Sequence, residues 1–135
     1  MKTLFPKKEC HIPKWFIIDA SNKTLGYLAT EVSQLLCGKY LSYFNSSVNQ
    51  NNYIIIINSS KIIITGQKFL KKYYYKNSNR PGSLKIETFK DLKNRIPNRI
   101  IEKAIWGMLP KNILGRQYFK NLYIYNVPNI FYTIK

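Results

Sequence analysis

The chain has 135 residues, and its hydrophobic fraction of 45% with an aromatic fraction of 15% excludes a disordered protein. Its 22 Lys and Arg residues against 6 Asp and Glu give a net charge of +16, which predicts a polyanionic partner, with nucleic acid favoured over an anionic membrane surface. No apolar run reaches the ~18 residues of a membrane-spanning helix. We expect one domain over residues 1–135, with short peripheral segments at residues 1–13 and 126–135.

The first half of the chain predicts strands on either side of a helix. The apolar run over Trp15–Asp19 is typical of a buried strand. Apolar residues then recur at helical spacing over Thr24–Leu36, and Gly38 follows where a C-terminal cap belongs. Two runs of β-branched residues predict strands over Tyr53–Ile57 and Ile62–Ile64.

The second half predicts two helices and an abrupt break. Thr88 and Asp91 match a capping box at the start of a short helix. Pro97 suits the first turn of a second helix, which is expected over Arg99–Met108. Pro110 ends this helix, because a proline disfavours helix in the residue before it.

The break is followed by a glycine and a last strand. Gly115 is expected to let the backbone turn tightly or approach a partner closely. The final strand is expected near Leu122–Tyr125. Strand, helix and strand, followed by helices and a strand, indicate an α/β sandwich around a small, mostly parallel sheet.

Side chains suited to catalysis or metal binding are scarce. His11 is the single histidine, and with Cys10 and Cys37 it supplies at most three metal ligands, at no recognised spacing. Asp19, at a strand end, is expected to accept hydrogen bonds from the backbone of the following turn. The segment Asp19–Gly26 lacks the glycine pattern of a phosphate loop. We therefore expect no enzyme activity, no metal, no cofactor and no small-molecule substrate.

Cations and aromatic residues are interleaved between Lys68 and Arg80. Cations neutralise phosphates, and tyrosines stack on splayed bases or bond to a phosphate or a 2′-hydroxyl. The alternative is a solvated loop whose tyrosines alternate into the core; for the whole segment we favour RNA contact. The candidates are Lys68, Lys71, Lys72, Tyr74, Lys76 and Arg80.

A second basic face is predicted on the helix before the break. Arg99, Lys103 and Trp106 fall at positions i, i+4 and i+7. An ordinary solvated edge, with Trp106 in the peripheral core, explains this pattern equally well. Beyond the helix, Lys111 and Arg116 are expected to point outward from rigid supports toward phosphates.

Four stretches also resemble the motifs of a known family. The stretches WFIIDASNKTLGYLAT, YIIIINSSKIIITGQK, YYYKNSNRPGSLK and WGMLPKNILGRQYFKNLYIY cover most of Lys14–Tyr125. In this order they are similar to motifs of the ribosomal protein L-thirteen family of the large subunit. The resemblance implies a three-layer α/β/α sandwich with a four-stranded sheet, direct binding to large-subunit ribosomal RNA, and no catalysis.

The resemblance also bears on single positions. Tyr27 stands where the family usually has Arg, which removes one phosphate contact, and nothing is carried over for residues 126–135. The helix dipole alone would explain Lys39. Basic positions of the family's motifs are matched by Lys39, Lys61, Lys68, Lys111 and Arg116, and Lys120 lies in the last stretch.

We predict a structural constituent of the large ribosomal subunit that binds rRNA through a basic surface, contacts neighbouring ribosomal proteins, and supports assembly and translation. The alternative is a free regulatory RNA- or DNA-binding module on the same fold, and a small nucleotide-handling enzyme ranks third. The excess of Lys over Arg with abundant Ile, Asn and Tyr is typical of an AT-rich genome. Because no targeting extension is recognised, a plastid is favoured over the cytoplasm of a low-GC bacterium.

Overall fold

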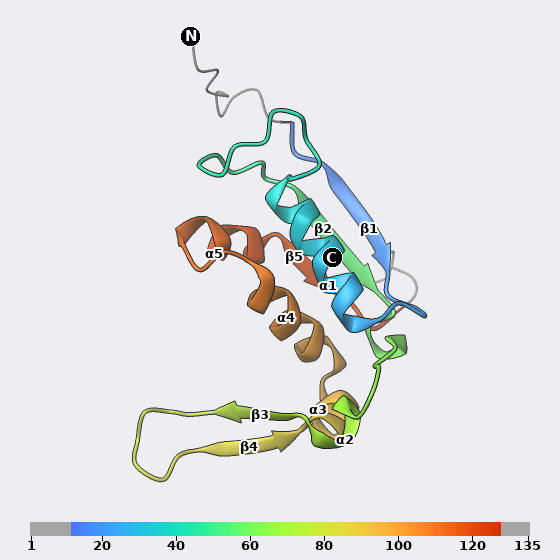
Figure 1. Ribbon diagram of the computed structural model, residues 1–135, viewed down its shortest axis with the longest axis vertical. Coiled ribbons are helices and arrows are strands. Elements are labelled where there is room, and N and C mark those ends of the chain that lie inside the picture. Colours follow the sequence, from blue (N-terminus) through green and yellow to red (C-terminus); the bar gives the residue numbers. More distant parts are fainter. Residues whose placement is uncertain (1–11, 128–135) are drawn as a thin grey trace.

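A computed structural model describes residues 12–127, which form a mixed α/β fold (Figure 1). Its parallel sheet contains β1 (Trp15–Asp19), β2 (Tyr53–Ile57) and β5 (Leu122–Ile124), in the order β1-β2-β5. The first two strands have the predicted bounds, and the last is one residue shorter than expected. The central strand β2 reads YIIII, and its β-branched residues suit a strand that is paired on both sides.

Three helices lie on one side of this sheet in Figure 1. They are α1 (Leu25–Cys37), α4 (Pro97–Met108) and α5 (Ile113–Lys120). The helices α1 and α4 were predicted to within two residues at each end. Gly38 ends α1 as expected, in a left-handed conformation with a φ of 75°.

The main core lies between the helices and the sheet face that they cover. Side chains of a strand alternate between its two faces, so every second strand residue points into this core. The strands contribute Phe16, Ile18, Ile54, Ile56, Leu122 and Ile124. The helices contribute, among others, Leu28, Leu36, Ile101, Ile105 and Tyr118.

The opposite face of the sheet carries a stack of aromatic rings. The ring centroid of Trp15 lies 4.4 Å from that of Tyr53 and 6.3 Å from that of Tyr123, with nearly parallel planes. Trp15 is 60% exposed, and the neighbouring Ile17 is 64% exposed. Within residues 12–127 the helices therefore cover one face of the sheet, and the expected third layer is not seen there.

The fourth strand expected over Ile62–Ile64 is reduced to a single parallel bridge between Thr24 and Ile63. The backbone of Ile63 bonds to the turn Lys23–Leu25, with N···O distances of 3.0 and 3.1 Å. A 3₁₀ turn, η2 (Ser59–Lys61), directs the chain away from the sheet edge. Among the described residues the parallel sheet therefore has three strands, where four were predicted.

A separate antiparallel hairpin occupies the segment that was predicted as a basic aromatic stretch. The strands β3 (Tyr73–Lys76) and β4 (Lys85–Thr88) follow the short helix α2 (Lys68–Lys71). Figure 1 shows the hairpin projecting from the end of the molecule opposite the loop of residues 38–52. The turn between its strands includes Gly82 with a φ of 72°, in the expected Pro-Gly turn.

A small second core anchors the hairpin. Phe89 and Leu92 of α3 (Phe89–Arg95) pack with Ile100 of α4, and Tyr74 of the hairpin lies against them. The predicted start of the helix at Thr88 is confirmed, since its Oγ1 atom accepts a hydrogen bond of 3.2 Å from the backbone N–H of Asp91. The Asp91 carboxylate accepts a hydrogen bond from the Thr88 hydroxyl, whereas in a full capping box it would accept from the backbone N–H. This core fixes the hairpin beside α4. Among the described helices none is long and apolar enough to cross a membrane.

Candidate nucleic-acid interface

The two faces of the hairpin differ in chemistry. Cross-strand pairs set Tyr75 opposite Ile86 and Lys76 opposite Lys85. Directly opposed residues share a face, so one face presents Tyr75 and Ile86, which are 63% and 56% exposed. The other face presents the two lysines toward the helices.

A groove of about 520 Å³ lies between the hairpin and the helices α3 and α4. Its charged lining consists of five cations and two acids: Lys76, Lys85, Arg95, Arg99, Lys103, Glu87 and Glu102. Arg95 pairs with Glu87 and Arg99 with Glu102, at N···O distances of 2.5 and 3.0 Å. The three lysines make no ion pair within residues 12–127. Positive charge is therefore left free where two elements converge, as a polyanion requires.

Tyr74 has a role inside the protein. Its ring centroid lies 6.0 Å from that of Phe89, and the ammonium groups of Lys72 and Lys103 lie 5.4 and 4.5 Å from its centre. Burial raises the pKa of its hydroxyl. The ring therefore packs within the protein and holds two lysines in place through cation–π contacts. Its contact with RNA stays a prediction.

The basic face continues along α4. Trp106 follows Arg99 and Lys103 on the same side of the helix, and all three line a second groove with Phe119 of α5. The rings of Trp106 and Phe119 meet edge to face at 5.1 Å. Trp106 is therefore both peripheral core, as one of the two readings held, and part of the basic face.

The break after Pro110 is built differently from the prediction for Lys111. The Nζ atom of Lys111 donates a hydrogen bond of 2.5 Å to the backbone carbonyl of Trp106, and it lies 4.8 Å from the centre of the Trp106 ring. Lys111 thus folds back onto the C-terminal end of the preceding helix α4, where a cation is favoured by the helix dipole.

Gly115 is not in a loop but in the first turn of α5. Asn112 is the N-cap residue, and its Oδ1 atom accepts a hydrogen bond of 2.8 Å from the backbone N–H of Gly115. A Cβ atom at Gly115 would lie 1.8 Å from the carbonyl oxygen of Pro110. The glycine therefore permits a close approach within this chain. Arg116, on the next position, is exposed.

The remaining predicted cations are spread over the surface. The structure brings Tyr74, Lys76, Arg99 and Lys103 together around the groove. The others are exposed but lie on several elements: Lys39 after α1, Lys61 on η2, Lys68 and Lys71 on α2, Lys72 before β3, Arg80 in the hairpin turn and Lys120 at the end of α5.

Sequence reasoning missed two groove cations, Lys85 and Arg95. The signal for Lys85 was present, because the turn at Pro81-Gly82 predicts a hairpin and alternation places Lys85 on the face of Lys76. Arg95 is brought to the groove by the packing of α3, which no local pattern indicates.

Of the residues considered for catalysis or metal binding, the structure describes Asp19 and Cys37. Asp19 accepts hydrogen bonds from the backbone N–H of Ser21 (2.9 Å) and from the Asn58 amide (3.0 Å), as predicted for the turn, and these bonds lower its pKa. Cys37 is a buried free thiol whose pKa is raised by burial. Cys10 and His11 lie outside the described residues, and within 12–127 no three potential ligands form a metal-binding group.

Comparisons with known proteins agree with the motifs. A family model described as Ribosomal protein L13 matches residues 13–129. The large ribosomal subunit protein uL13 of Crocosphaera subtropica is 48% identical over 128 residues, which are 95% of this chain and 85% of that protein. The protein uL13c of Guillardia theta is 48% identical over 92% of this chain and 87% of its own length. The protein uL13 of Prochlorococcus marinus is 48% identical over 92% of this chain and 83% of its own length.

Proposed function

Because the chain belongs to the ribosomal protein L13 family, we propose that it is a structural constituent of the large ribosomal subunit, the particle for which its relatives are named. The observation that carries this function is the family match over residues 13–129. The role is structural and not enzymatic, and the free regulatory module is not favoured.

We propose that the chain binds large-subunit rRNA as one domain over residues 1–135 and that the groove between the hairpin and α4 is the centre of its RNA-facing surface. The free charges of Lys76, Lys85 and Lys103 in this groove support the proposal. Lysine acts as a point charge and not as a bidentate reader of a base edge. Phosphate and sugar contacts should therefore outnumber base-edge contacts.

The proposed surface extends from the groove along both ends of α4. It includes the hairpin and α2 at one end and the break after Pro110 at the other. Arg99 and Lys103 of α4 line both grooves and connect the two ends. The proposed contacts comprise Lys39, Lys61, Lys68, Lys71, Lys72, Tyr74, Lys76, Lys85, Arg80, Arg99, Lys103, Lys111, Arg116 and Lys120. Neighbouring ribosomal proteins are the other proposed partners.

The relatives also bear on the compartment. Two of those named above are cyanobacterial, and the third is the protein uL13c of Guillardia theta. This distribution agrees with the plastid that the composition favoured. We place the chain in the plastid ribosome, in the large subunit.

The complete architecture implied by the family, a four-stranded sheet between two helical layers, is also proposed. Two features support it: the parallel bridge of Ile63 to Thr24, and the aromatic face of Trp15, Tyr53 and Tyr123, which a further layer would cover. An experimental structure of the whole chain in its particle tests this.

Co-sedimentation tests the function. Lysate of cells that express a tagged chain is separated on a sucrose gradient, and the large-subunit fraction is washed with high salt. A ribosomal constituent stays with the large subunit through the wash. A free regulatory module is found near the top of the gradient or is removed by the salt.

A further inference from the structure

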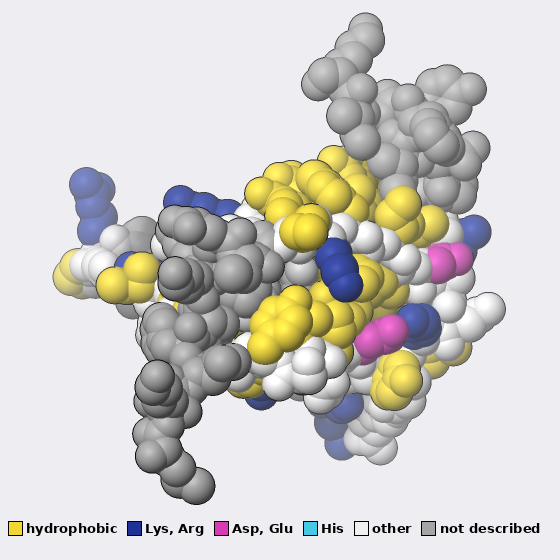
Figure 2. Space-filling model, turned by 90° about the horizontal axis from the view of Figure 1, so that it is seen from above, with side chains coloured by type: hydrophobic (Ala, Val, Ile, Leu, Met, Phe, Trp, Pro, Cys, Tyr) yellow, Lys and Arg dark blue, Asp and Glu magenta, His cyan; other side chains and the backbone are white. Residues whose placement is uncertain are grey.

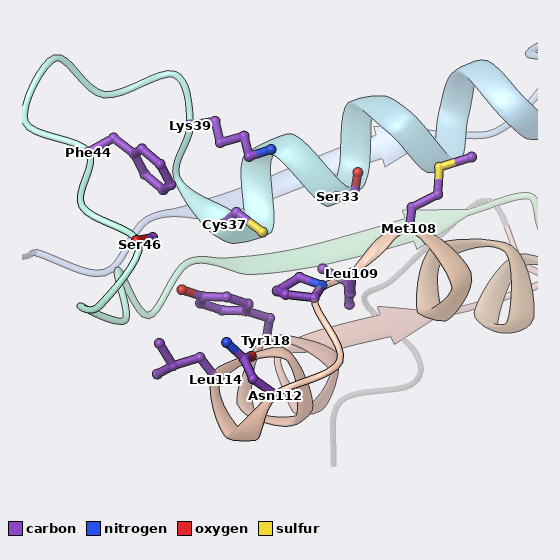
Figure 3. Close-up of a pocket in the computed structure, with 11 residues that line it drawn as sticks. Ser33, Cys37, Lys39, Phe44, Ser46, Met108, Leu109, Asn112, Leu114 and Tyr118 are labelled. Carbon is purple, nitrogen blue, oxygen red and sulfur yellow. The ribbon is translucent and has the colours of Figure 1, made fainter.

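A pocket of about 310 Å³ lies where α1 ends and where α4 breaks from α5. Figure 3 shows the rings of Phe44 and Tyr118 toward one end of the pocket and Met108 and Leu109 toward the other. Its volume is at the lower end of the about 300–1,000 Å³ that is typical of ligand pockets. This size suits one flat, planar group better than a folded chain segment.

The walls of the pocket are held in place. The loop of residues 38–52 forms one wall, and the side chain of Asn49 links it to Gln117 of α5 with a hydrogen bond of 3.2 Å. At the other side of the loop, the Asn52 amide donates a hydrogen bond of 2.9 Å to the backbone carbonyl of Leu35 in α1. Because both helices are tied to the loop, the pocket is formed before any ligand arrives.

The chemistry of the lining favours an anionic ligand with a flat apolar body. Lys39 is the one charged side chain among the lining residues, and no acid is among them. The Oδ1 atom of Asn112 accepts from Gly115, so its amide nitrogen is left to donate to a ligand. Phe44 is 38% exposed at the rim and offers a ring face for stacking.

The surroundings of the pocket match this chemistry. Tyr40, Tyr43 and Phe44, from the loop beside Lys39, are each more than a third exposed. Figure 2 views this end of the molecule and shows hydrophobic side chains gathered at its centre, with Lys or Arg side chains among them. An exposed apolar surface with basic residues fits single-stranded RNA, whose bases stack on aromatic rings while its phosphates meet cations.

We propose that this pocket receives one extruded nucleobase of the large-subunit rRNA, with the phosphate of that nucleotide against Lys39. The base stacks on Phe44, and the amide of Asn112 donates a hydrogen bond to its edge. This inference rests on the proposed function, since it adds a base-specific contact to a surface that otherwise binds phosphates. A side chain of a partner protein would use the apolar floor but would leave Lys39 and the Asn112 amide without a role.

The test fills the pocket and leaves the charge unchanged. Ser46→Trp places an indole at the rim, on an exposed loop position that lines the pocket. Ser42→Trp is the matched control, because Ser42 is exposed on the same loop but is not among the lining residues. Both variants are titrated against large-subunit rRNA transcribed from the genome that encodes the chain. Base-edge reactivity of the bound RNA is read with dimethyl sulfate and carbodiimide.

We expect Ser46→Trp to bind about tenfold or more weakly, as for the loss of one stacked base, with an unchanged salt dependence. One or a few bases that the wild type protects should become reactive. Ser42→Trp should stay within about twofold of the wild type, since it leaves the stacked base in place. Should Ser46→Trp fail to fold by circular dichroism, Phe44→Ala replaces it, with the same expectation.

Wild-type affinity and unchanged base reactivity in the pocket variant would overturn the inference. Normal rRNA binding with a defect confined to joining other ribosomal proteins would also overturn it, since the pocket would then hold a protein side chain. A wild-type chain that binds no rRNA would remove the proposed RNA interface, and this inference with it. The first two results leave that interface intact, so the failures are distinguishable.

Discussion

Replacing Gly115 with Ala should destabilise the protein strongly, because the break after Pro110 leaves no room for a methyl group. The added Cβ atom would lie 1.8 Å from the carbonyl oxygen and 2.9 Å from the carbonyl carbon of Pro110. These are backbone atoms, so no side chain can rotate away, and α5 has to move by roughly 1.5 Å to restore a normal contact.

The magnitude follows from this geometry. Overpacking typically lowers the free energy of unfolding by about 1–3 kcal/mol. Because the neighbour of Gly115 is rigid backbone, the loss for Gly115→Ala should be at the upper end of this range, at about 3 kcal/mol. For a domain of this size, 1 kcal/mol corresponds to roughly 3–4 °C in the midpoint of thermal unfolding. The expected loss is therefore about 10 °C, measured by circular dichroism of the full chain.

Gly107→Ala is the matched control, since it makes the same change inside α4. A Cβ atom at Gly107 would meet no atom within 4 Å. Alanine is a better helix former by about 0.5–1 kcal/mol, so this variant should melt about 2–4 °C higher than the wild type. A Gly115→Ala variant with a wild-type midpoint would refute the close approach of Pro110 and α5.

Three further results are expected. Lys111→Met should lower the free energy of unfolding by about 1 kcal/mol, because α4 loses its C-terminal cation and a hydrogen bond; an unchanged urea midpoint would contradict the contact with Trp106. Arg116→Ala should leave stability unchanged but reduce the slope of log affinity for rRNA against log salt by about 0.7–0.9, and an equal slope would mean that this side faces solvent. Asp19→Asn should lose less stability than the wild type as the pH falls below the ordinary pKa of 3.8, because the hydrogen bond from Ser21 lowers the pKa of Asp19 in the folded protein, and the resulting stabilisation is lost progressively as the pH falls from 3.8 through that lowered pKa; parallel pH curves would contradict this.

The parts of the fold that were predicted have strong local signals. The helix of Pro97–Met108 shows a clear apolar stripe, a proline in its first turn and a proline two residues after its end. The strand Tyr53–Ile57 is an uninterrupted apolar run of strand length, and the strand Trp15–Asp19 is an apolar run that ends at Asp19. Apolar periodicity and the prolines near helix ends predict these elements correctly, because burial and local conformational preference agree there.

The elements that were missed are those where local preference and tertiary packing disagree. The helix α5 spans only eight residues and contains Gly115, and glycine is a poor helix former. Its sequence therefore predicts a loop unless Asn112 is recognised as an N-cap residue. The apolar run Ile62–Ile64 predicts a strand, but its side chains go to different places: Ile62 enters the main core and Ile64 packs against the second core. The backbone of Ile63 bonds to the turn before α1.

In the candidate site, too, local sequence patterns predict some residues, whereas tertiary packing determines how these residues come together. The basic face of Arg99 and Lys103 follows from helical spacing, and Lys76 of the hairpin follows from the basic, aromatic composition of its segment. Their meeting in one groove depends on Tyr74 packing beside Phe89, a contact between segments far apart in the sequence. The contact of Lys111 with the end of α4 could not be predicted either, because it depends on where the last carbonyls of α4 point.

The salt dependence of rRNA binding tests the central claim most directly, with two charge-matched double variants. Lys85→Ala with Lys103→Ala removes two free cations from the groove, and Lys14→Ala with Lys90→Ala removes two exposed cations outside it. The groove variant should lower the slope of log affinity against log salt by about 1.4–1.8, which corresponds to two phosphates, and the control should keep the wild-type slope. Equal slopes in the two variants would contradict the account, because rRNA would then respond to the total charge and not to the groove between the hairpin and α4.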